Sequence, residues 1–196
     1  MNKYDAATGA LVKTLFEELN PDYVEPLDPL IFVKNHPDEF LYLSQRDGYK
    51  HFYLYNTDGK FLGQITKGFW VVTDFLGFDK DGKTLYYTST ATSPLEQNIY
   101  SVSLTPASTP LRLSQDAGAH QGILSPDGSY VIDRFSSSSV PRTILVEDAK
   151  GKTVQKLLTS DNPLKDYAMG RTMILSMLAA DSATTLYGRI ILPPNF

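Results

Sequence analysis

One pattern recurs four times along the chain: an apolar residue, a short polar turn and a second apolar run. The four segments begin at Tyr4, Tyr55, Tyr100 and Val146, which places them 45 to 51 residues apart. Between them lie three more polar turns, at residues 35–39, 79–83 and 125–129. Each period therefore contains two hairpins. This repeat constrains the fold most, because a small repeated unit can bury its apolar face only against neighbouring copies.

Two hairpins in about 40–50 residues give four short strands, which is the pattern of one blade of a β-propeller. We therefore predict an all-β fold: a partial β-propeller, residues 1–165, with about three four-stranded antiparallel blades. The predicted parts are the last hairpin of a preceding blade and three blades, at about residues 1–26, 27–74, 75–120 and 121–165. An antiparallel β-sandwich is the alternative, since it also has short strands at regular spacing.

Glycines stand singly in the polar turns, at positions 9, 59, 82, 128 and 151. Glycine reaches positive φ without a steric penalty, so the Asp-Gly pairs predict type I′ hairpin turns. A phosphate-binding loop would need several glycines together before a helix, and none is found. Three blades are fewer than the four to eight that close a propeller ring. Unpaired blade faces and edges therefore predict self-association.

Residues 166–196 differ from the repeat. Residues 164–180 have helix-forming composition, but residues 183–192 alternate like a strand, and we favour a hairpin that turns at Ala180–Ala183. The chain then reaches Pro193 and Pro194. Because a domain rarely ends on a strand followed by two prolines, this segment is interpreted as a linker and the first strands of a junction to a further domain.

Composition excludes several classes of function. The 196 residues carry 18 Lys and Arg against 22 Asp and Glu, a net charge of -4, and show no basic run. Nucleic acid is therefore not an expected partner. Without cysteine there is no disulfide, thiolate metal site or cysteine nucleophile, and the three histidines lack the spacing of metal ligands, so no metal or cofactor is expected. No apolar run is long enough to span a membrane.

Catalytic residues are not expected in this chain. A serine hydrolase needs a nucleophile elbow of the form GxSxG, and none is present. Ser136–Ser139 is interpreted as a polar loop between strands, because serine without an adjacent base is a weak nucleophile. His51 is expected to be a packed, hydrogen-bonded structural imidazole, and His120 to lie near the central channel. Trp70 is expected to pack within a blade, and Glu17 and Glu18 to be solvated.

Five collinear stretches resemble the dipeptidyl peptidase IV family, within the prolyl oligopeptidase group of serine peptidases. They are RDGYKHFYLY (46–55), LGQITKGFWVV (62–72), LYYTS (85–89) with PLEQNIYSVSL (94–104), SPDGSYVID (125–133) with SVP (139–141), and LYGRIILPPNF (186–196). Val71 stands where the family usually has Glu, and Gln97 where it is often basic. The resemblance covers nearly the whole chain, which corresponds to the carboxy-terminal part of the family's N-terminal propeller.

The resemblance implies an eight-bladed propeller that covers a Ser-Asp-His α/β-hydrolase domain and admits short peptides, which are cut after a penultimate Pro or Ala. The acidic residues that hold the substrate's amino terminus belong to an earlier blade than those present here. The linker at residues 23–29 is similar to one that approaches the substrate side of the channel. It therefore suggests Tyr23 and Glu25 as substrate-proximal residues. The family also implies a periplasmic or extracellular location.

Two hypotheses follow. In the first, the chain is a non-catalytic gating and positioning segment of a bacterial-type dipeptidyl peptidase IV relative. Its partners would then be the α/β-hydrolase domain, the other blades and, in the whole protein, a peptide substrate. In the second, it is an independent propeller-type binding module that assembles a ring from several chains. The segment at residues 187–196 favours the first, because a stand-alone binder has no need of it.

Overall fold

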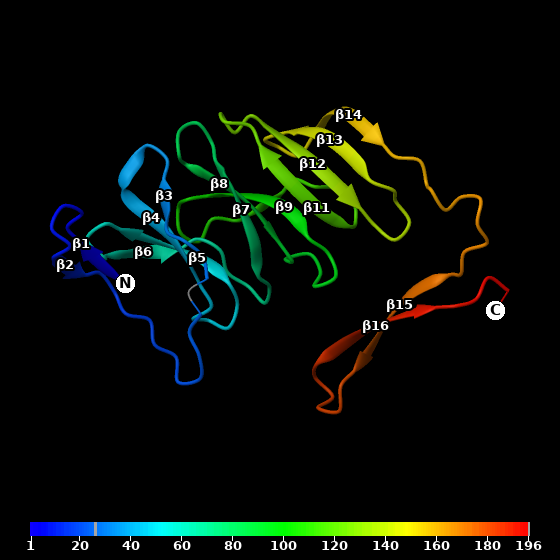
Figure 1. Cartoon of the computed structure of the whole chain (residues 1–196), viewed down its shortest axis with the longest axis horizontal. Helices are drawn as coiled ribbons and strands as arrows, with labels where there is room; N and C mark the ends of the chain where they lie inside the picture. Colours follow the sequence, from blue (N-terminus) through cyan, green and yellow to red (C-terminus); the bar gives the residue numbers. More distant parts are fainter. Residues whose placement is uncertain (26, 196) are drawn as a thin grey trace.

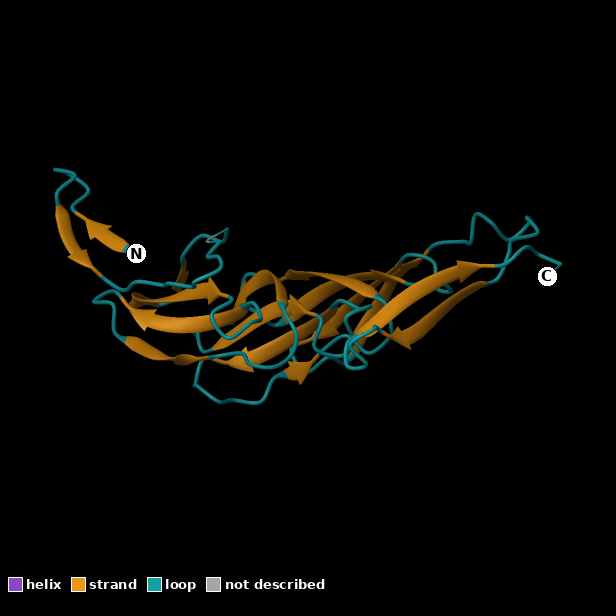
Figure 2. Cartoon of the chain, turned by 90° about the horizontal axis from the view of Figure 1, so that it is seen from below, coloured by secondary structure: helices purple, strands orange, loops and turns teal. Residues whose placement is uncertain are grey.

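The computed structural model describes residues 1–25 and 27–195, and in this part of the chain the only regular elements are β-strands (Figures 1 and 2). Pro26, in the proposed linker, and Phe196, at the end of the last motif, lie outside the described residues. Three four-stranded antiparallel sheets follow one another along the chain, between two isolated hairpins. The predicted all-β class with four-stranded antiparallel units is confirmed.

Each sheet is a simple meander, in which strands adjacent in sequence pair with each other. The first sheet contains β3 (Ile31–Val33), β4 (His36–Ser44), β5 (His51–Asn56) and β6 (Phe61–Gln64). The second contains β7 (Val72–Phe78), β8 (Thr84–Ser89), β9 (Asn98–Ser103) and β10 (Leu111–Arg112). The third contains β11 (Ala119–Leu124), β12 (Tyr130–Ser136), β13 (Thr143–Asp148) and β14 (Thr153–Thr159).

The two hairpins are β1 (Asn2–Tyr4) with β2 (Leu11–Thr14), and β15 (Thr172–Leu178) with β16 (Thr185–Ile191). The second one confirms the hairpin expected near Ala180 and excludes the helical alternative for residues 164–180. Asp181 stabilises its turn by accepting hydrogen bonds from the amides of Ala183 and Thr184, at 2.9 and 2.8 Å. Figure 1 shows this hairpin beyond a long connection, while the three sheets lie side by side in chain order.

The apolar core lies between the sheets. Both faces of β5 are buried, as are both faces of most of β8 and β9, because neighbours cover the first and second sheets on each side. One cluster, which includes Leu41, Phe52, Val72 and Tyr87, joins the first two sheets. A smaller one, which includes Ile99 and Val131, joins the second and third. Each fully buried apolar side chain in these clusters contributes about 1.5–3 kcal/mol to the stability of the fold, because its surface is removed from water.

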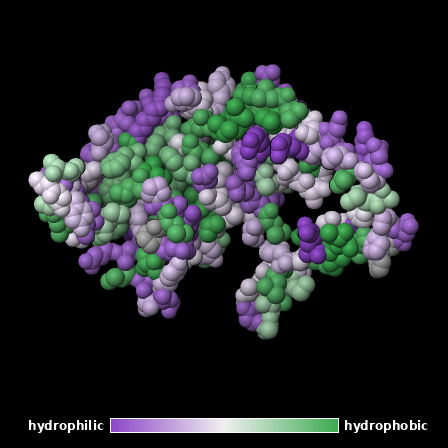
Figure 3. All heavy atoms as spheres, in the orientation of Figure 1, coloured by the Kyte–Doolittle hydropathy of each residue, from purple (hydrophilic) through white to green (hydrophobic). Residues whose placement is uncertain are grey.

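The third sheet buries only one face. Its strand β12 alternates strictly between exposed and buried residues, and β14 is exposed throughout. The outer face, defined here by the aligned residues of β11 to β14, carries exposed apolar side chains, and Figure 3 shows a hydrophobic patch over β12 to β14. Its exposed apolar members include Ile123, Ile132 and Leu158.

The turns between strands differ from the type I′ turns predicted. Type I′ needs positive φ at two central residues. In these loops only the glycine has it, with φ of 83° at Gly59 and 71° at Gly82, while the preceding aspartates do not. The loops are instead three or four residues long, counted inside the closing hydrogen bonds Asn56–Lys60 and Asp79–Thr84, and the amide of each glycine donates to the carbonyl three residues before it. The Asp or Asn that begins a loop stabilises it: Asp79, for example, accepts a hydrogen bond from the amide of Lys83 at 2.8 Å.

Glycine in these loops has a second purpose that the sequence does not reveal, because the loops of successive sheets stack on one another. A Cβ atom at Gly82 would lie 1.8 Å from the carbonyl oxygen of Lys34, in the first sheet. A Cβ atom at Gly128 would lie 2.5 Å from the Cα of Asp79, in the second sheet. The amide of Lys80 also donates to the carbonyl of Asp127 at 3.0 Å. These contacts fix the spacing of adjacent sheets.

Strand direction assigns the loops to two ends of the sheets. In a four-stranded meander the first and third turns lie at one end, and the middle turn lies at the other together with the connections between sheets. We call this second end the connection end. It contains residues 15–25, 27–30, 45–50, 65–71, 90–97, 113–118, 137–142 and 160–171. The chain leaves the third sheet toward β15 from this end.

Candidate functional site

A small open cleft lies at the connection end of the first sheet. The segment between β2 and β3 forms one wall with Glu18, Tyr23 and Glu25, and the end of β4 and the turn after it form the other, with Arg46 and Lys50. The structure therefore places both residues suggested by the sequence, Tyr23 and Glu25, in one cleft. The same cleft is lined by Arg46 and Lys50, two cationic residues that the sequence analysis did not associate with Tyr23 and Glu25.

Glu18 and Arg46 fix the inner wall of this cleft. The Ser44 hydroxyl donates a hydrogen bond to the Glu18 carboxylate, and Arg46 Nε lies 3.6 Å from Glu18 Oε1. Only 13% of the Glu18 side chain is exposed. The expectation that Glu18 is solvated is therefore wrong, whereas Glu17 is exposed as expected. The reason is tertiary: the segment after β2 folds over the end of β4 and presses this carboxylate against Ser44.

The Arg46 guanidinium is held in one orientation by aromatic neighbours. Its carbon lies 4.3 Å from the centre of the Tyr53 ring, and its Nη1 donates to the Tyr55 hydroxyl at 2.6 Å. A stacked, hydrogen-bonded guanidinium loses little further entropy when it binds a carboxylate or a carbonyl oxygen. Arg46 is therefore preorganised to bind an anionic or polar ligand group.

The phenols of the cleft stay protonated near neutral pH. Burial, and then the hydrogen bond and charge of Glu18, raise the pKa of Tyr42 to about 12. The hydrogen bond and charge of Glu25 raise the pKa of Tyr23 above its usual value. Both phenols are therefore hydrogen-bond donors and not bases. Together with the Lys50–Asp28 ion pair, at 3.4 Å, these groups give the cleft the chemistry of a binding site.

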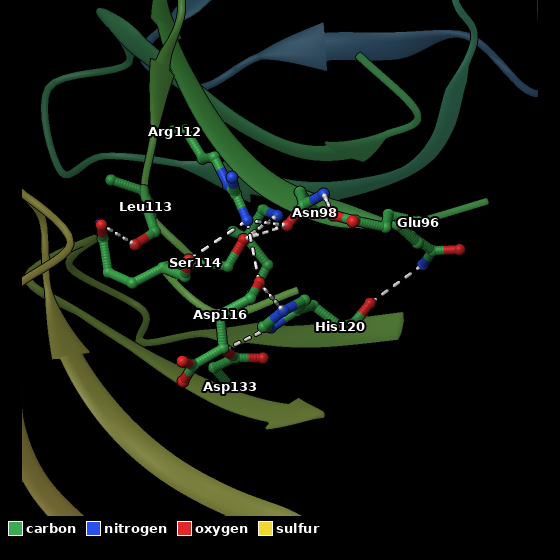
Figure 4. A network of polar contacts seen from close by, with 11 residues as sticks. Glu96, Asn98, Arg112, Leu113, Ser114, Asp116, His120 and Asp133 are labelled. Carbon is green, nitrogen blue, oxygen red and sulfur yellow. Dashed lines mark hydrogen bonds and ion pairs between the residues drawn. The ribbon is translucent and has the colours of Figure 1, made fainter. Parts of the chain in front are cut away.

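A second polar cluster is buried between the second and third sheets (Figure 4). His120 on β11 is 1% exposed, and its Nδ1 lies 2.7 Å from Asp133 Oδ2 on β12. Its Nε2 lies 3.0 Å from the carbonyl oxygen of Asp116, to which it donates. Burial alone would lower the pKa of His120, but the hydrogen bond and charge of Asp133 outweigh burial and raise it. His120 therefore packs between the second and third sheets, and its position near the central channel stays a prediction.

Both ring nitrogens of His120 are occupied, so no nitrogen is free to activate a serine. The backbone of His120 ties the third sheet to the second, because its amide donates to the carbonyl of Gln97, just before β9, at 2.8 Å. Sequence reasoning missed Asp133 as its partner. The available signal was the alternation Val131, Asp133, Phe135, in which a carboxylate takes a buried position of β12.

Glu147 on β13 lies on the same buried face, diagonally from Asp133 across the strand pair. Glu147 is 1% exposed. Burial, and then repulsion from Asp133, raise the pKa of Glu147 to about 7. This carboxyl therefore holds a proton in the folded protein under conditions in which an ordinary glutamate is ionised.

The other residues considered from sequence have structural roles. His51 is buried, with Nδ1 3.1 Å from Thr66 Oγ1 and Nε2 3.0 Å from the carbonyl oxygen of Gly68, which confirms a structural imidazole. Trp70 packs on His51 and on the core, as expected. Ser137–Ser139 form a loop after β12. Among residues 1–25 and 27–195 no group of three or more His, Cys, Asp or Glu residues could hold a metal ion. In the same residues, no helix is long and apolar enough to cross a membrane.

The family described as "Dipeptidyl peptidase IV (DPP IV) N-terminal region" has a sequence profile that matches residues 1–142. The chain belongs to this family. It is 31% identical over 167 residues to dipeptidyl peptidase 4 of Trichophyton rubrum, an alignment that covers 83% of this chain and 21% of that protein. It is 29% identical over 182 residues to probable dipeptidyl peptidase 4 of Aspergillus flavus, covering 91% of this chain and 23% of that protein.

Two solved structures of dipeptidyl peptidase IV type resemble the chain. One, a putative dipeptidyl aminopeptidase IV from Bacteroides ovatus, superposes with a TM-score of 0.87 and 34% identity over 98% of this chain and 30% of its own. The other, Porphyromonas gingivalis dipeptidyl peptidase 4, superposes with a TM-score of 0.80 and 28% sequence identity. This match covers 95% of this chain and 26% of that protein. The chain thus spans about a fifth of the curated relatives' length. The fold is that of the dipeptidyl peptidase IV N-terminal propeller region. The relatives are fungal and bacterial, so the expected bacterial origin stays a prediction.

Proposed function

We propose that the chain is a non-catalytic part of the propeller of a dipeptidyl peptidase, where it limits access to the peptidase site and helps to position the peptide. The observation that carries the proposal is the match of all three sheets and the final hairpin, in order, to the dipeptidyl aminopeptidase IV fold. In the whole protein the peptidase activity would belong to an α/β-hydrolase domain, and its substrates would be short peptides with a penultimate Pro or Ala.

The cleft of Tyr23, Glu25 and Arg46 is the proposed point of contact with the peptide. It lies at the connection end, from which the chain continues toward β15 and β16, and its groups complement a peptide: carboxylates for an ammonium, and a guanidinium for carbonyl oxygens. The hairpin β15–β16 exposes Ile174, Met177 and Leu178, which suit it to pack against the hydrolase domain. By family resemblance, the whole protein would act in the periplasm or outside the cell.

The test uses the full-length protein encoded by the source gene and an Xaa-Pro chromogenic substrate. We expect the full-length protein to release the chromophore and the purified 196-residue chain to release none. In the full-length protein, Tyr23→Phe with Glu25→Gln should raise KM more than it lowers kcat, because these groups are proposed to bind and not to react. Glu17→Gln, an exposed carboxylate on the same segment, is the matched control.

Two results would overturn this proposal. A reading frame without a nucleophile elbow after this segment would make the chain a stand-alone binding module. Turnover by the purified 196-residue chain, abolished by a serine-directed inhibitor, would place catalysis where we expect none.

Self-association of the isolated chain is proposed from the outer face of the third sheet, with Ile123, Ile132 and Leu158 exposed. Sedimentation velocity should show oligomers that dissociate in the Leu158→Lys variant. A monomer at all concentrations would contradict this part of the proposal.

A further inference from the structure

A groove lies at the connection end between the first and second sheets. One wall comes from the segment that leads into β3 and from both ends of the turn between β4 and β5, and the other from the beginning of β7. The amide of Val72 donates to the carbonyl of Lys50 at 2.8 Å and joins the two walls. Both sheets have all four strands, so two complete neighbours form this groove.

The groove is continuous with the cleft proposed to contact the peptide. Glu25, Asp28, Gln45 and Lys50 line both of them. A peptide bound in the cleft can therefore place one side chain in the groove, and the chemistry of the groove then determines which side chain fits.

The charges that line the groove do not cancel. Lys50 Nζ lies 3.4 Å from Asp28 Oδ2, with 26% and 30% of the two side chains exposed, so these charges compensate each other. Glu25 has no such partner in the part of the chain that the structure describes, where the ion pairs involve the acids Glu18, Asp28 and Asp133. Because Lys50 is the only cation among the described lining residues, one negative charge remains, on Glu25.

Apolar side chains stand next to this carboxylate. Leu27 is 72% exposed, and Val71 is half-buried at the opposite wall. Lysine and arginine place their methylene stems along such apolar surface and keep the charged end at polar groups. A metal ion suits the groove less well, because residues 1–25 and 27–195 contain no group of three or more His, Cys, Asp or Glu residues that could hold one.

We propose that this groove binds the side chain of a lysine or arginine of the peptide, with its charged end at Glu25 and its methylene stem on Leu27 and Val71. The proposal rests on the proposed function, because it takes the occupant to be a peptide. It makes Glu25 a specificity-determining residue, which selects peptides with a basic side chain by charge complementarity.

The test compares two peptides that differ in one charge, acetyl-Ala-Lys-Ala-amide and acetyl-Ala-norleucine-Ala-amide. Their ends are neutral, so the lysine ammonium is their only difference in charge. The purified 196-residue chain is titrated with each peptide and followed by NMR. We expect saturable shifts at the amides of Val71, Val72 and Thr73, and about three- to fivefold tighter binding of the lysyl peptide, as for a partly exposed ion pair. Added salt should reduce this preference.

Two variants should change the preference in opposite directions. Glu25→Gln removes the uncompensated charge and should abolish the preference for the lysyl peptide. Lys50→Gln leaves the Asp28 carboxylate uncompensated and should increase the preference. It keeps the backbone bond between Lys50 and Val72, so it should remain folded. Glu17→Gln is the matched control, because Glu17 is exposed on the same segment but does not line the groove, and its removal should change nothing.

The inference is overturned if the two peptides bind equally well, if no shift saturates, if the preference survives in Glu25→Gln, or if it falls in Lys50→Gln. These outcomes are independent of turnover. An active full-length peptidase whose propeller chain shows no preference for the lysyl peptide would refute the groove and leave the proposed function intact. A preference in the chain, together with a full-length protein that releases no chromophore, would refute the proposed function and leave a binding site for basic peptides.

Discussion

Glu147 provides the strongest test of how this fold handles buried charge. Its carboxyl is buried beside Asp133, and its pKa rises from 4.5 to about 7 on folding. A carboxyl that holds its proton more tightly in the folded state stabilises the fold most at low pH. This stability is fully present below about pH 4.5, is lost as the pH rises through 7, and changes no further above that.

The size of the effect follows from the two pKa values. At about 1.4 kcal/mol for each pKa unit, the rise corresponds to a loss of up to about 3 kcal/mol in the free energy of unfolding. The charges that act on Glu147 are those of Asp133, Asp116 and Asp148, which raise its pKa, and that of His120, which lowers it. His120 adds to the trend in the same direction, because its own pKa is raised and its contribution also falls as the pH rises.

Glu147→Gln tests this reasoning, because glutamine has nearly the same shape and cannot ionise. We expect the variant to be more stable than the parent chain at pH 8, with the difference shrinking steadily toward pH 4. Urea unfolding between pH 4 and pH 8, followed by the fluorescence of Trp70, the single tryptophan, measures the free energies at one protein concentration. Glu17→Gln is the matched control, since Glu17 is exposed and its removal should leave the pH profile unchanged.

One result would refute the argument. If the free energy of unfolding of Glu147→Gln follows the same pH profile as that of the parent chain, then Glu147 is ionised in the folded protein and its burial has no energetic consequence.

Three further predictions concern the fold. Gly82→Ala should lower the free energy of unfolding by about 1–3 kcal/mol more than Gly9→Ala in urea denaturation, because both glycines have φ of 71° but only Gly82 touches backbone of another sheet; equal losses would show that inter-sheet packing is irrelevant there. His51→Phe should cost about 1–3 kcal/mol by leaving the Thr66 O–H without an acceptor and the Gly68 carbonyl without its donor, whereas a neutral result in the same assay would argue against a structural imidazole. Asp181→Ala should accelerate hydrogen exchange at the Thr184 amide, measured by NMR, and unchanged protection would contradict the role of Asp181 in the hairpin turn.

Local sequence patterns were sufficient to predict those features of the fold that depend on residues close together in the sequence. The alternation of apolar residues predicted the strands, and the spacing of polar turns predicted how the strands group into sheets. The turn type was wrong because the Asp-Gly signal also suits longer loops, in which an Asp or Asn side chain accepts backbone hydrogen bonds. Whether an Asp-Gly pair forms a type I′ turn or a longer loop depends on the loop length, which the sequence pattern predicts only to within one or two residues.

The candidate sites were only partly accessible from sequence. Tyr23 and Glu25 were identified through family resemblance, but nothing near them in sequence indicates that Arg46 and Lys50 share their cleft. Glu18 was misjudged because its partner Ser44 lies 26 residues away.

The sequence by itself determined that this chain is a repeat of four-stranded antiparallel units and that it lacks a nucleophile elbow, because both are properties of residue order and spacing. The tertiary structure alone decided which charges are buried and which face open space. Glu147 and Arg134 both belong to the third sheet, yet one is enclosed against the second sheet and the other stands on the outer face. Burial depends on what packs across a sheet, and that partner lies far away along the chain.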